Sequence, residues 1–280
     1  EGFVGQSLQE FARSRSVDLE TFFAIAIQLT DTLGRLHRQN IIHKDIKPAN
    51  IIIDPETLET RITDFSIAAI LPDTRVNLPP NQHLEGTLAY MSPEQTGRID
   101  RAIDYRTDFY ALGITFYELL AGRLPFNASE PMEWVHAHLA KSATPLCQLC
   151  PSIPPIVSDI IDKLIAKRPE ARYQSAYGLK ADLNSCAQQW RDRHQIEPFP
   201  LARHDRSVEL RLPDKLYGRE AEIQSLSIAL DRASRGTTEL VLVRGYSGIG
   251  KSALVGELHA PTTRRGGYFI DGKFDRFGQD

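Results

Sequence analysis

Four polar side chains in the first quarter of the chain have the types and the order that phosphoryl transfer needs. Asp45, Lys47 and Asn50 stand close together, and Asp64 follows nineteen residues after Asp45. Phosphoryl transfer requires a carboxylate that orients the attacking hydroxyl and a cation on the transferred phosphoryl group. It also requires oxygen ligands that hold Mg2+ on the nucleotide phosphates. The four residues supply this set in order, so they predict a phosphotransfer site that uses ATP and Mg2+.

A second phosphate-binding pattern lies near the end of the chain. Residues 245–252 read Gly-Tyr-Ser-Gly-Ile-Gly-Lys-Ser, which fits the pattern G-x-x-x-x-G-K-[ST]. Lys251 would reach the β- and γ-phosphates of a nucleotide, and Ser252 would ligate Mg2+. At average composition a chain of this length contains the pattern by chance about one time in a hundred. The glycines that would let backbone N–H groups converge on phosphate oxygens are Gly245, Gly248 and Gly250.

Short strands and long helices are expected around the first group of residues. An apolar face of helical period runs from Asp18 to Gln39, with Asp18 at the N-cap position. Runs of β-branched residues predict short strands at 41–42, 51–53 and 61–63, and a polar loop follows from about 72 to 85. Helical patterns return at Thr107–Leu120, Met132–Ala140, Ile156–Lys167 and Ala176–Arg191. The predicted phosphotransfer residues therefore lie on loops between strands, beside a helical body.

From His43 to Asn50 the chain resembles the catalytic loop of eukaryotic-like protein kinases, and Asp64-Phe65-Ser66 resembles their magnesium-binding motif. The resemblance implies Asp45 as catalytic base, Lys47 on the γ-phosphate, and Asn50 and Asp64 as metal ligands. A lysine two residues after the aspartate is the Ser/Thr form of the loop, so the implied partner is a protein with a Ser or Thr acceptor. The family's other matches, between Ser7 and Arg193, include the segment Met91–Glu94, the bracing Asp108, the turn at Gly122 and Arg172 as partner of Glu94.

Two substitutions and one absence depart from the family's pattern. Lys44 replaces the usual arginine, which removes a bidentate partner for a phosphorylated loop, and Ser66 replaces a glycine. The few residues before Ser7 cannot hold a glycine-rich loop, a strand lysine and its partner glutamate. We therefore expect residues 1–193 to be the large C-terminal lobe only, and this fragment alone to be inactive. Two hypotheses stay open for the parent protein, a working kinase or a catalytically silent scaffold with a nucleotide-switched P-loop domain, and a third is that the chain is mainly an ATPase.

The second phosphate-binding pattern has the neighbours that a P-loop ATPase requires. Leu216 to Glu220 resembles the opening motif of AAA-type signalling ATPases, and a helix is expected from Arg219 to Arg235. A strand at Glu239–Arg244 and a helix from Ala253 would flank the loop, and Gly267 to Asp275 would be the next strand. The resemblance implies that 214–280 begin an α/β P-loop domain. Kinase followed by ATPase is the order found in large bacterial multidomain signalling proteins.

Composition sets the remaining limits. The 280 residues carry a net charge of −3, with 41% apolar and 25% charged residues, which is typical of a globular protein. The sequence has no excess of positive charge that would favour nucleic-acid binding, and no apolar run is long enough for a membrane span. Three cysteines make no disulfide framework, so a cytoplasmic location is expected. The predicted fold class is a mainly α kinase large lobe of the α+β protein kinase fold over 1–193, a linker over 194–213, and the start of an α/β P-loop domain over 214–280.

Overall fold

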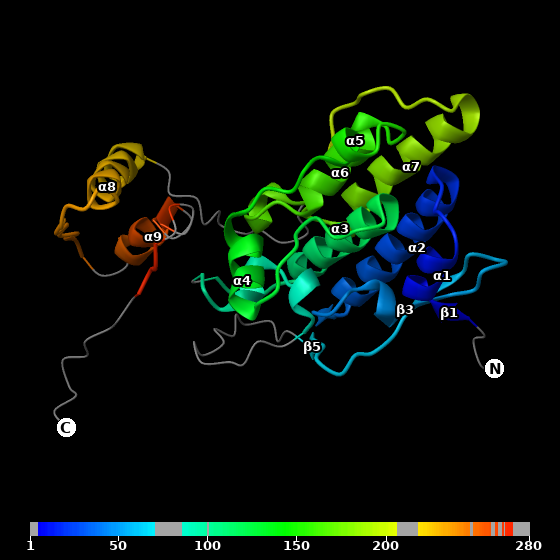
Figure 1. The fold of residues 1–280 in the computed structure, drawn as a ribbon, viewed down its shortest axis with the longest axis horizontal. Helices are drawn as coiled ribbons and strands as arrows, with labels where there is room; N and C mark the ends of the chain where they lie inside the picture. Colours follow the sequence, from blue (N-terminus) through cyan, green and yellow to red (C-terminus); the bar gives the residue numbers. More distant parts are fainter. Residues whose placement is uncertain are drawn as a thin grey trace. The chain divides into compact units, whose positions relative to one another are not determined.

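The computed structural model describes residues 5–70, 86–99, 101–205, 218–246, 249–258, 261–262, 265 and 267–270. The chain divides into two compact units, Glu1–Arg211 and Leu212–Asp280 (Figure 1). The polar loop expected over 72–85 lies outside the described residues.

The first unit consists of seven described helices and five described short strands. The helices are α1 (Leu8–Ser14), α2 (Leu19–Arg38), α3 (Arg106–Ala121), α4 (Pro131–Ala140), α5 (Leu146–Leu149), α6 (Pro155–Leu164) and α7 (Ala176–Arg193). The strands are β1 (Gln6–Ser7), β2 (Ile41–Ile42), β3 (Ile51–Ile53), β4 (Thr60–Ile62) and β5 (Ala69–Ile70). Single 3-10 turns are η1 (Pro48–Asn50), η2 (Leu88–Tyr90), η3 (Pro93–Thr96) and η4 (Pro169–Ala171).

Two small antiparallel sheets place the loops of the predicted phosphotransfer site. In one sheet the strand order is β1-β3-β4, with Ile51 opposite Ile62, and in the other β2 pairs with β5. The loop from 43 to 50 leaves β2 and enters β3, and Asp64 follows the end of β4. The expected strands at 41–42 and 51–53 are confirmed, and the third lies one residue earlier than expected, at 60–62.

Helix α2 begins and ends where the sequence predicts. The side chain of Asp18 accepts a hydrogen bond from the backbone N–H of Thr21 at 2.8 Å, which satisfies a free donor of the first turn. Its buried face includes Phe22, Leu29 and Leu33, each fully shielded from solvent. Helices α2 and α7 lie side by side with α3 beside them (Figure 1). Burial of this face stabilises the helix more than intrinsic propensity does.

Helix α3 is the central helix of the first unit. Almost all of its residues are buried, polar ones included, so no single face of it meets solvent. A helix that is buried all round carries little amphipathic pattern, and this explains its weak periodicity. It ends at Gly122, whose positive φ of 67° provides the left-handed cap that glycine adopts without strain.

The residues just after α7 pack against the first unit, although a linker is expected there. Ile196 is buried, and the backbone N–H of Ala202 donates to the carboxylate of Asp182 at 2.7 Å. Asp205 accepts hydrogen bonds from the Ser175 hydroxyl and from the backbone N–H of Gln174, both at 2.6 Å. The chain therefore returns along α7 to its first turn, and 194–205 form part of the first unit.

The described part of the second unit holds two helices, α8 (Glu220–Ala233) and α9 (Lys251–Gly256), close to the positions expected. The strand expected at Glu239–Arg244 does not form: the segment is irregular, and Leu240 is 95% exposed. A strand needs a neighbour to pair its backbone N–H and C=O groups, and none of the described residues pairs with this segment. Of the next expected strand, 267–270 are also irregular and the rest lies outside the described residues.

Candidate active site

Asp108, at the start of the buried helix α3, holds the catalytic loop in shape. Its two carboxylate oxygens accept the backbone N–H groups of His43 at 3.0 Å and of Lys44 at 2.9 Å. The ring of His37, from α2, lies 2.9 Å from the same carboxylate. Lys44 has a positive φ of 67°, a conformation that non-glycine residues rarely adopt. The bracing role that the resemblance implies for Asp108 is thus present in the geometry.

Asp45 lies at the centre of a group of donors. Its Oδ2 accepts from the Lys47 ammonium at 2.6 Å and from the Asn50 side-chain amide at 2.9 Å. Its Oδ1 accepts from the backbone N–H of Thr87 at 3.0 Å, and the Lys47 ammonium also donates to the Thr87 hydroxyl at 2.5 Å. Three predicted site residues are therefore in direct contact, and Thr87 joins them from across the sequence.

This arrangement keeps Asp45 ionised. Burial alone would raise the pKa of its carboxyl, but the hydrogen bonds from Lys47 and Thr87 and the positive charge of Lys47 outweigh burial and leave the pKa lowered. At neutral pH Asp45 is therefore a carboxylate with a positive charge beside it. Such a group can accept a hydrogen bond from an incoming hydroxyl.

Gly86 allows the backbone to approach Asp45. Its φ of 103° lies in the region that side chains rarely adopt, and a Cβ there would lie 3.6 Å from the Asp45 carboxylate. The next residue, Thr87, makes the contact with Asp45 described above. Glycine at this position therefore sets the path by which the segment reaches the catalytic loop.

Asn50 and Asp64 present oxygen atoms suited to a hard divalent cation. The Asn50 amide nitrogen donates to the backbone carbonyl of Asp45 and to its side chain, so the amide oxygen is the end left to face a cation. Asp64 is exposed, and its carboxylate accepts a long 3.4 Å hydrogen bond from the Ser66 N–H. Hydrogen bonding to Ser66 lowers the pKa of Asp64, which favours the charged form. The side-chain oxygens of Asn50 and Asp64 therefore fit as ligands of an Mg2+ ion on a nucleotide.

The hydrogen bonds of Thr63 connect the two expected metal ligands. Its backbone N–H and its hydroxyl both donate to the backbone carbonyl of Asn50, at 2.9 and 3.1 Å. The same residue's carbonyl contacts the ring of His43 at 3.0 Å. Asp64 directly follows Thr63, so the strand end that carries it is fixed to the catalytic loop.

A buried ion pair anchors the segment beyond Thr87. Arg172 and Glu94 meet through two hydrogen bonds of 2.6 and 2.8 Å, with both side chains at most 1% exposed. The Thr107 hydroxyl donates to Glu94 at 2.8 Å and lies 2.7 Å from the Ser92 hydroxyl. The pairing implied by the resemblance is therefore formed, and Ser92 takes part in it through its hydroxyl.

Two further contacts could not be found from the sequence. The Gln95 side chain donates to the backbone carbonyl of Lys44 at 2.8 Å, and His43 stacks edge-on against Phe65 with ring centroids 4.8 Å apart. Neither contact follows from the spacing of its residues, because each joins loops that are distant in sequence.

The second predicted site is only partly described. Gly250 has a φ of 90° and stands at the N-cap of α9. The Lys251 ammonium donates to the carbonyl oxygens of Gly245 at 2.9 Å and Tyr246 at 2.8 Å, so it folds back over the start of the loop. Ser252 is exposed in the first turn of the helix, and Gly248 lies outside the described residues.

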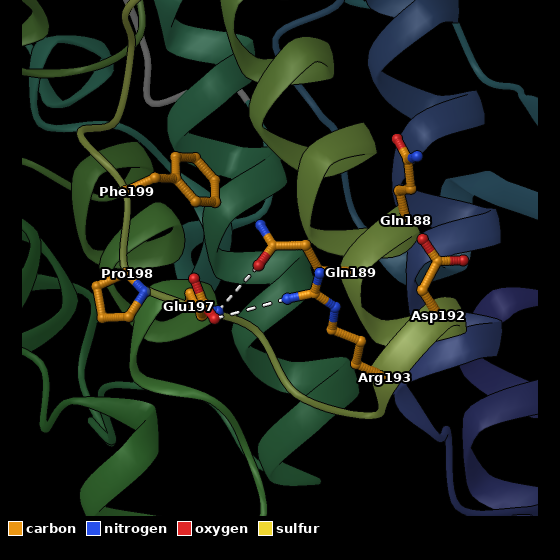
Figure 2. Close-up of a pocket in the computed structure, with 7 residues that line it drawn as sticks. All are labelled: Gln188, Gln189, Asp192, Arg193, Glu197, Pro198 and Phe199. Atoms are coloured by element: carbon orange, nitrogen blue, oxygen red, sulfur yellow. Dashed lines mark hydrogen bonds and ion pairs between the residues drawn. The ribbon is translucent and has the colours of Figure 1, made fainter.

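A pocket of the first unit lies at the end of α7. Figure 2 shows that residues at the end of α7 and from the segment after it line this pocket. Glu197 is engaged by its neighbours there: its backbone N–H donates to the side-chain oxygen of Gln189 at 3.0 Å, and its carboxylate lies 3.7 Å from Arg193. None of the predicted site residues lines it. Within the described ranges, no helix combines the length and apolar character needed to cross a membrane.

Comparison with known proteins identifies the first unit. A sequence profile of the protein kinase domain matches residues 1–183, which is more than half of the chain. The chain belongs to the protein kinase family. A profile of the AAA ATPase domain matches residues 215–280.

Several kinases of other organisms are similar to the chain. A hybrid signal transduction histidine kinase G of Dictyostelium discoideum is 30% identical over 94% of the chain. A probable serine/threonine-protein kinase of Clostridium perfringens is 33% identical over 64% of it, and the serine/threonine-protein kinase PknB of Mycolicibacterium smegmatis is 35% identical over 52%. The chain spans 10%, 26% and 23% of the length of these three relatives.

Proposed function

We propose that this protein transfers the γ-phosphate of ATP to Ser or Thr hydroxyls of other proteins. The observation that carries the proposal is the Asp45 carboxylate, which is kept ionised and in contact with Lys47, Asn50 and Thr87. Support comes from the family assignment and from relatives named as serine/threonine-protein kinases. The setting we propose is bacterial signal transduction in the cytoplasm.

The chain's own residues divide the work of the reaction. Asp45 accepts a hydrogen bond from the acceptor hydroxyl, which aims its oxygen at the phosphorus atom, and takes the proton as the new O–P bond forms and the bond to the leaving diphosphate oxygen breaks. Lys47 balances charge that develops on the transferred group, since its ammonium already stands 2.6 Å from Asp45. Positioning and charge stabilisation carry the catalysis, with no covalent intermediate.

Mg2+ and ATP complete the site in this proposal. Asn50 and Asp64 would hold the cation through their side-chain oxygens, and the metal would neutralise phosphate charge. The rigid connection of both residues to Thr63 supports this assignment because it fixes the spacing of the two donors.

The second unit would bind another ATP at residues 245–252. The left-handed Gly250 and the Lys251 ammonium, which now contacts backbone carbonyls, support a loop that can turn its N–H groups and its lysine towards phosphate. The glycines Gly245 and Gly248 would allow close approach of the phosphates, and Ser252 would ligate Mg2+. The domain boundaries that go with this proposal are a large kinase lobe over 1–193, a connection over 194–213 whose first part, 194–205, packs against that lobe, and the ATPase start over 214–280.

The test compares the full-length protein with its Asp45→Asn variant. Transfer of radioactive phosphate from ATP to a generic Ser/Thr protein substrate should fall by about two to four orders of magnitude, because the amide cannot take the proton. Asp192→Asn makes the same change on an exposed carboxylate far from the loop and should leave the rate unchanged.

The outcome separates the two hypotheses for the protein. Loss of transfer in Asp45→Asn alone supports the kinase reaction. Background transfer in all three proteins would refute it and would favour a scaffold whose remaining nucleotide-driven function is the Lys251 site.

A further inference from the structure

A buried histidine lies between the central helix and the segment that contacts Asp45. His138, in α4, is 1% exposed. Its Nδ1 lies 2.9 Å from the hydroxyl of Tyr110 in α3, and its Nε2 lies 2.8 Å from the carbonyl oxygen of Leu88. Leu88 begins η2 and directly follows Thr87, whose N–H donates to Asp45. Helix α3 is therefore linked to Thr87, which contacts the catalytic carboxylate, by two hydrogen bonds of His138 and by the peptide bond between Thr87 and Leu88.

The partners of the ring determine its tautomer. A backbone carbonyl can only accept, so Nε2 of His138 carries the proton, and Nδ1 accepts from the Tyr110 hydroxyl. Burial, together with the positive charge of Lys167, lowers the pKa of His138 to about 4. The ring is therefore neutral at physiological pH, and both of its nitrogens have a partner.

Aromatic side chains hold the ring in one orientation. Trp134 stacks on it with centroids 6.0 Å apart and an interplanar angle of 21°, and Phe126 meets it edge-on at 5.4 Å. A ring fixed on its faces and at both nitrogens directs its Nε2–H at one point in space. That point is the Leu88 carbonyl.

The Leu88 carbonyl accepts its shorter hydrogen bond from His138, at 2.8 Å. The other donor is the backbone N–H of Met91, at 3.3 Å, which is long for such a bond. Removal of the imidazole would therefore loosen the turn at the residue that follows Thr87. The hydrogen bonds described for the Asn50 and Asp64 side chains go to Asp45 and Ser66 rather than to this turn, so we expect the effect on the acceptor side of the site.

We infer that His138 is a positioning residue for the protein acceptor: it fixes the Leu88 carbonyl and so holds Thr87 and the adjoining backbone against Asp45, where the acceptor hydroxyl must lie. The inference rests on the proposed phosphotransfer function. It gives helix α4 a role in positioning the acceptor, separate from the roles of Asp45, Lys47, Asn50 and Asp64.

Steady-state kinetics of the full-length protein test the inference. His138→Leu keeps apolar bulk but removes the donor, and should lower kcat/KM for the acceptor about fivefold to tenfold, the loss expected for one hydrogen bond. The KM for ATP should stay unchanged. His138→Gln should restore most of the acceptor kcat/KM, since its amide nitrogen can donate to Leu88. The matched control is Ile160→Val, a small core change in α6 that leaves the His138 contacts in place.

Hydrogen exchange supplies a readout that needs no activity. Exchange of the amides of Thr87, Tyr90 and Met91, which bond to Asp45, Thr87 and Leu88, should speed up in His138→Leu and not in Ile160→Val. Tyr110→Phe, which leaves the core volume nearly intact, serves if His138→Leu fails to fold. It should raise exchange in the same segment to a smaller extent.

The outcomes are distinct. Acceptor kcat/KM and exchange in His138→Leu equal to those in the control would overturn the inference, and so would an ATP KM that rises as much as the acceptor KM. Absence of transfer in the wild-type protein would refute the proposed function and the acceptor role together. The exchange data would then still decide whether His138 holds the segment.

Discussion

Removal of the guanidinium of Arg172 should destabilise the first unit more than removal of the charge on its partner Glu94. Arg172 donates to both oxygens of Glu94 and to the backbone carbonyls of Ala166, Arg106 and Lys167, at 2.6 to 3.2 Å. Its side chain is fully buried. Arg172→Met keeps the length of the side chain but leaves a buried carboxylate and three carbonyl groups without these donors.

The magnitudes follow from what each variant leaves behind. After Arg172→Met, Glu94 keeps the hydrogen bond from the Thr107 hydroxyl but loses both bonds from the guanidinium, so the cost should be about 3–5 kcal/mol. After Glu94→Gln, the amide oxygen still accepts from Arg172, which keeps its three carbonyl partners, so the cost should be about 1–3 kcal/mol. The double variant should cost less than the sum of the two, because its members share one interaction.

Tryptophan fluorescence during urea unfolding measures these values for the first unit alone. Both tryptophans of the chain, Trp134 and Trp190, lie in that unit. The same ranking should appear in thermal melts, where Arg172→Met lowers Tm by on the order of 10 °C. Equal costs for the two single variants, or a cost below about 1 kcal/mol for Arg172→Met, would refute the reasoning that buried partners left unsatisfied dominate.

Three further predictions follow from contacts elsewhere in the chain. Asp205→Ala should destabilise the first unit by about 1–2 kcal/mol in urea titrations, since Ser175 and the Gln174 N–H lose their acceptor; an unchanged midpoint would show that 194–205 act as a free linker. His138 has a pKa near 6.5 in the unfolded chain but about 4 in the folded protein, so the folded state resists its protonation. As the pH drops from 6.5 to 4, the free energy of unfolding of the wild type should therefore fall relative to that of His138→Gln, by up to about 3 kcal/mol. Parallel plots of unfolding free energy against pH for the two proteins would contradict the neutral ring. Lys251→Ala should abolish binding of a fluorescent ATP analogue at the second unit while phosphotransfer by the first unit persists, and retained binding at that unit would contradict the P-loop assignment.

The predicted site residues of the first unit follow a local pattern, and the structure brings most of them into contact. Asp45, Lys47 and Asn50 lie on one loop, so their closeness follows from chain connectivity, and Asp64 reaches them through the pairing of two neighbouring strands. Asp18 similarly marks the start of α2 because capping involves only the residues that follow it. The assignment of Asp45, Lys47, Asn50 and Asp64 to catalysis and metal binding stays a prediction.

Other features depend on partners that the local pattern does not contain. The expected strand at Glu239–Arg244 has β-branched and apolar residues, yet a strand forms only when another segment supplies hydrogen bonds. The segment after α7 has the composition of a linker, but Asp205 finds its partners at the other end of that helix. In both cases local composition favours one state and tertiary contacts determine another.

The sequence by itself determined the kinase family, the order of the two nucleotide-binding patterns and most helix positions, because these depend on residues a few positions apart. Only the tertiary structure decided which distant groups bond to the catalytic loop and to the turn beyond Thr87. His138 is 50 residues from Leu88, and Gln95 is 51 from Lys44. Such contacts form because burial leaves polar groups no solvent to bond with, so each must find a partner wherever the fold places one.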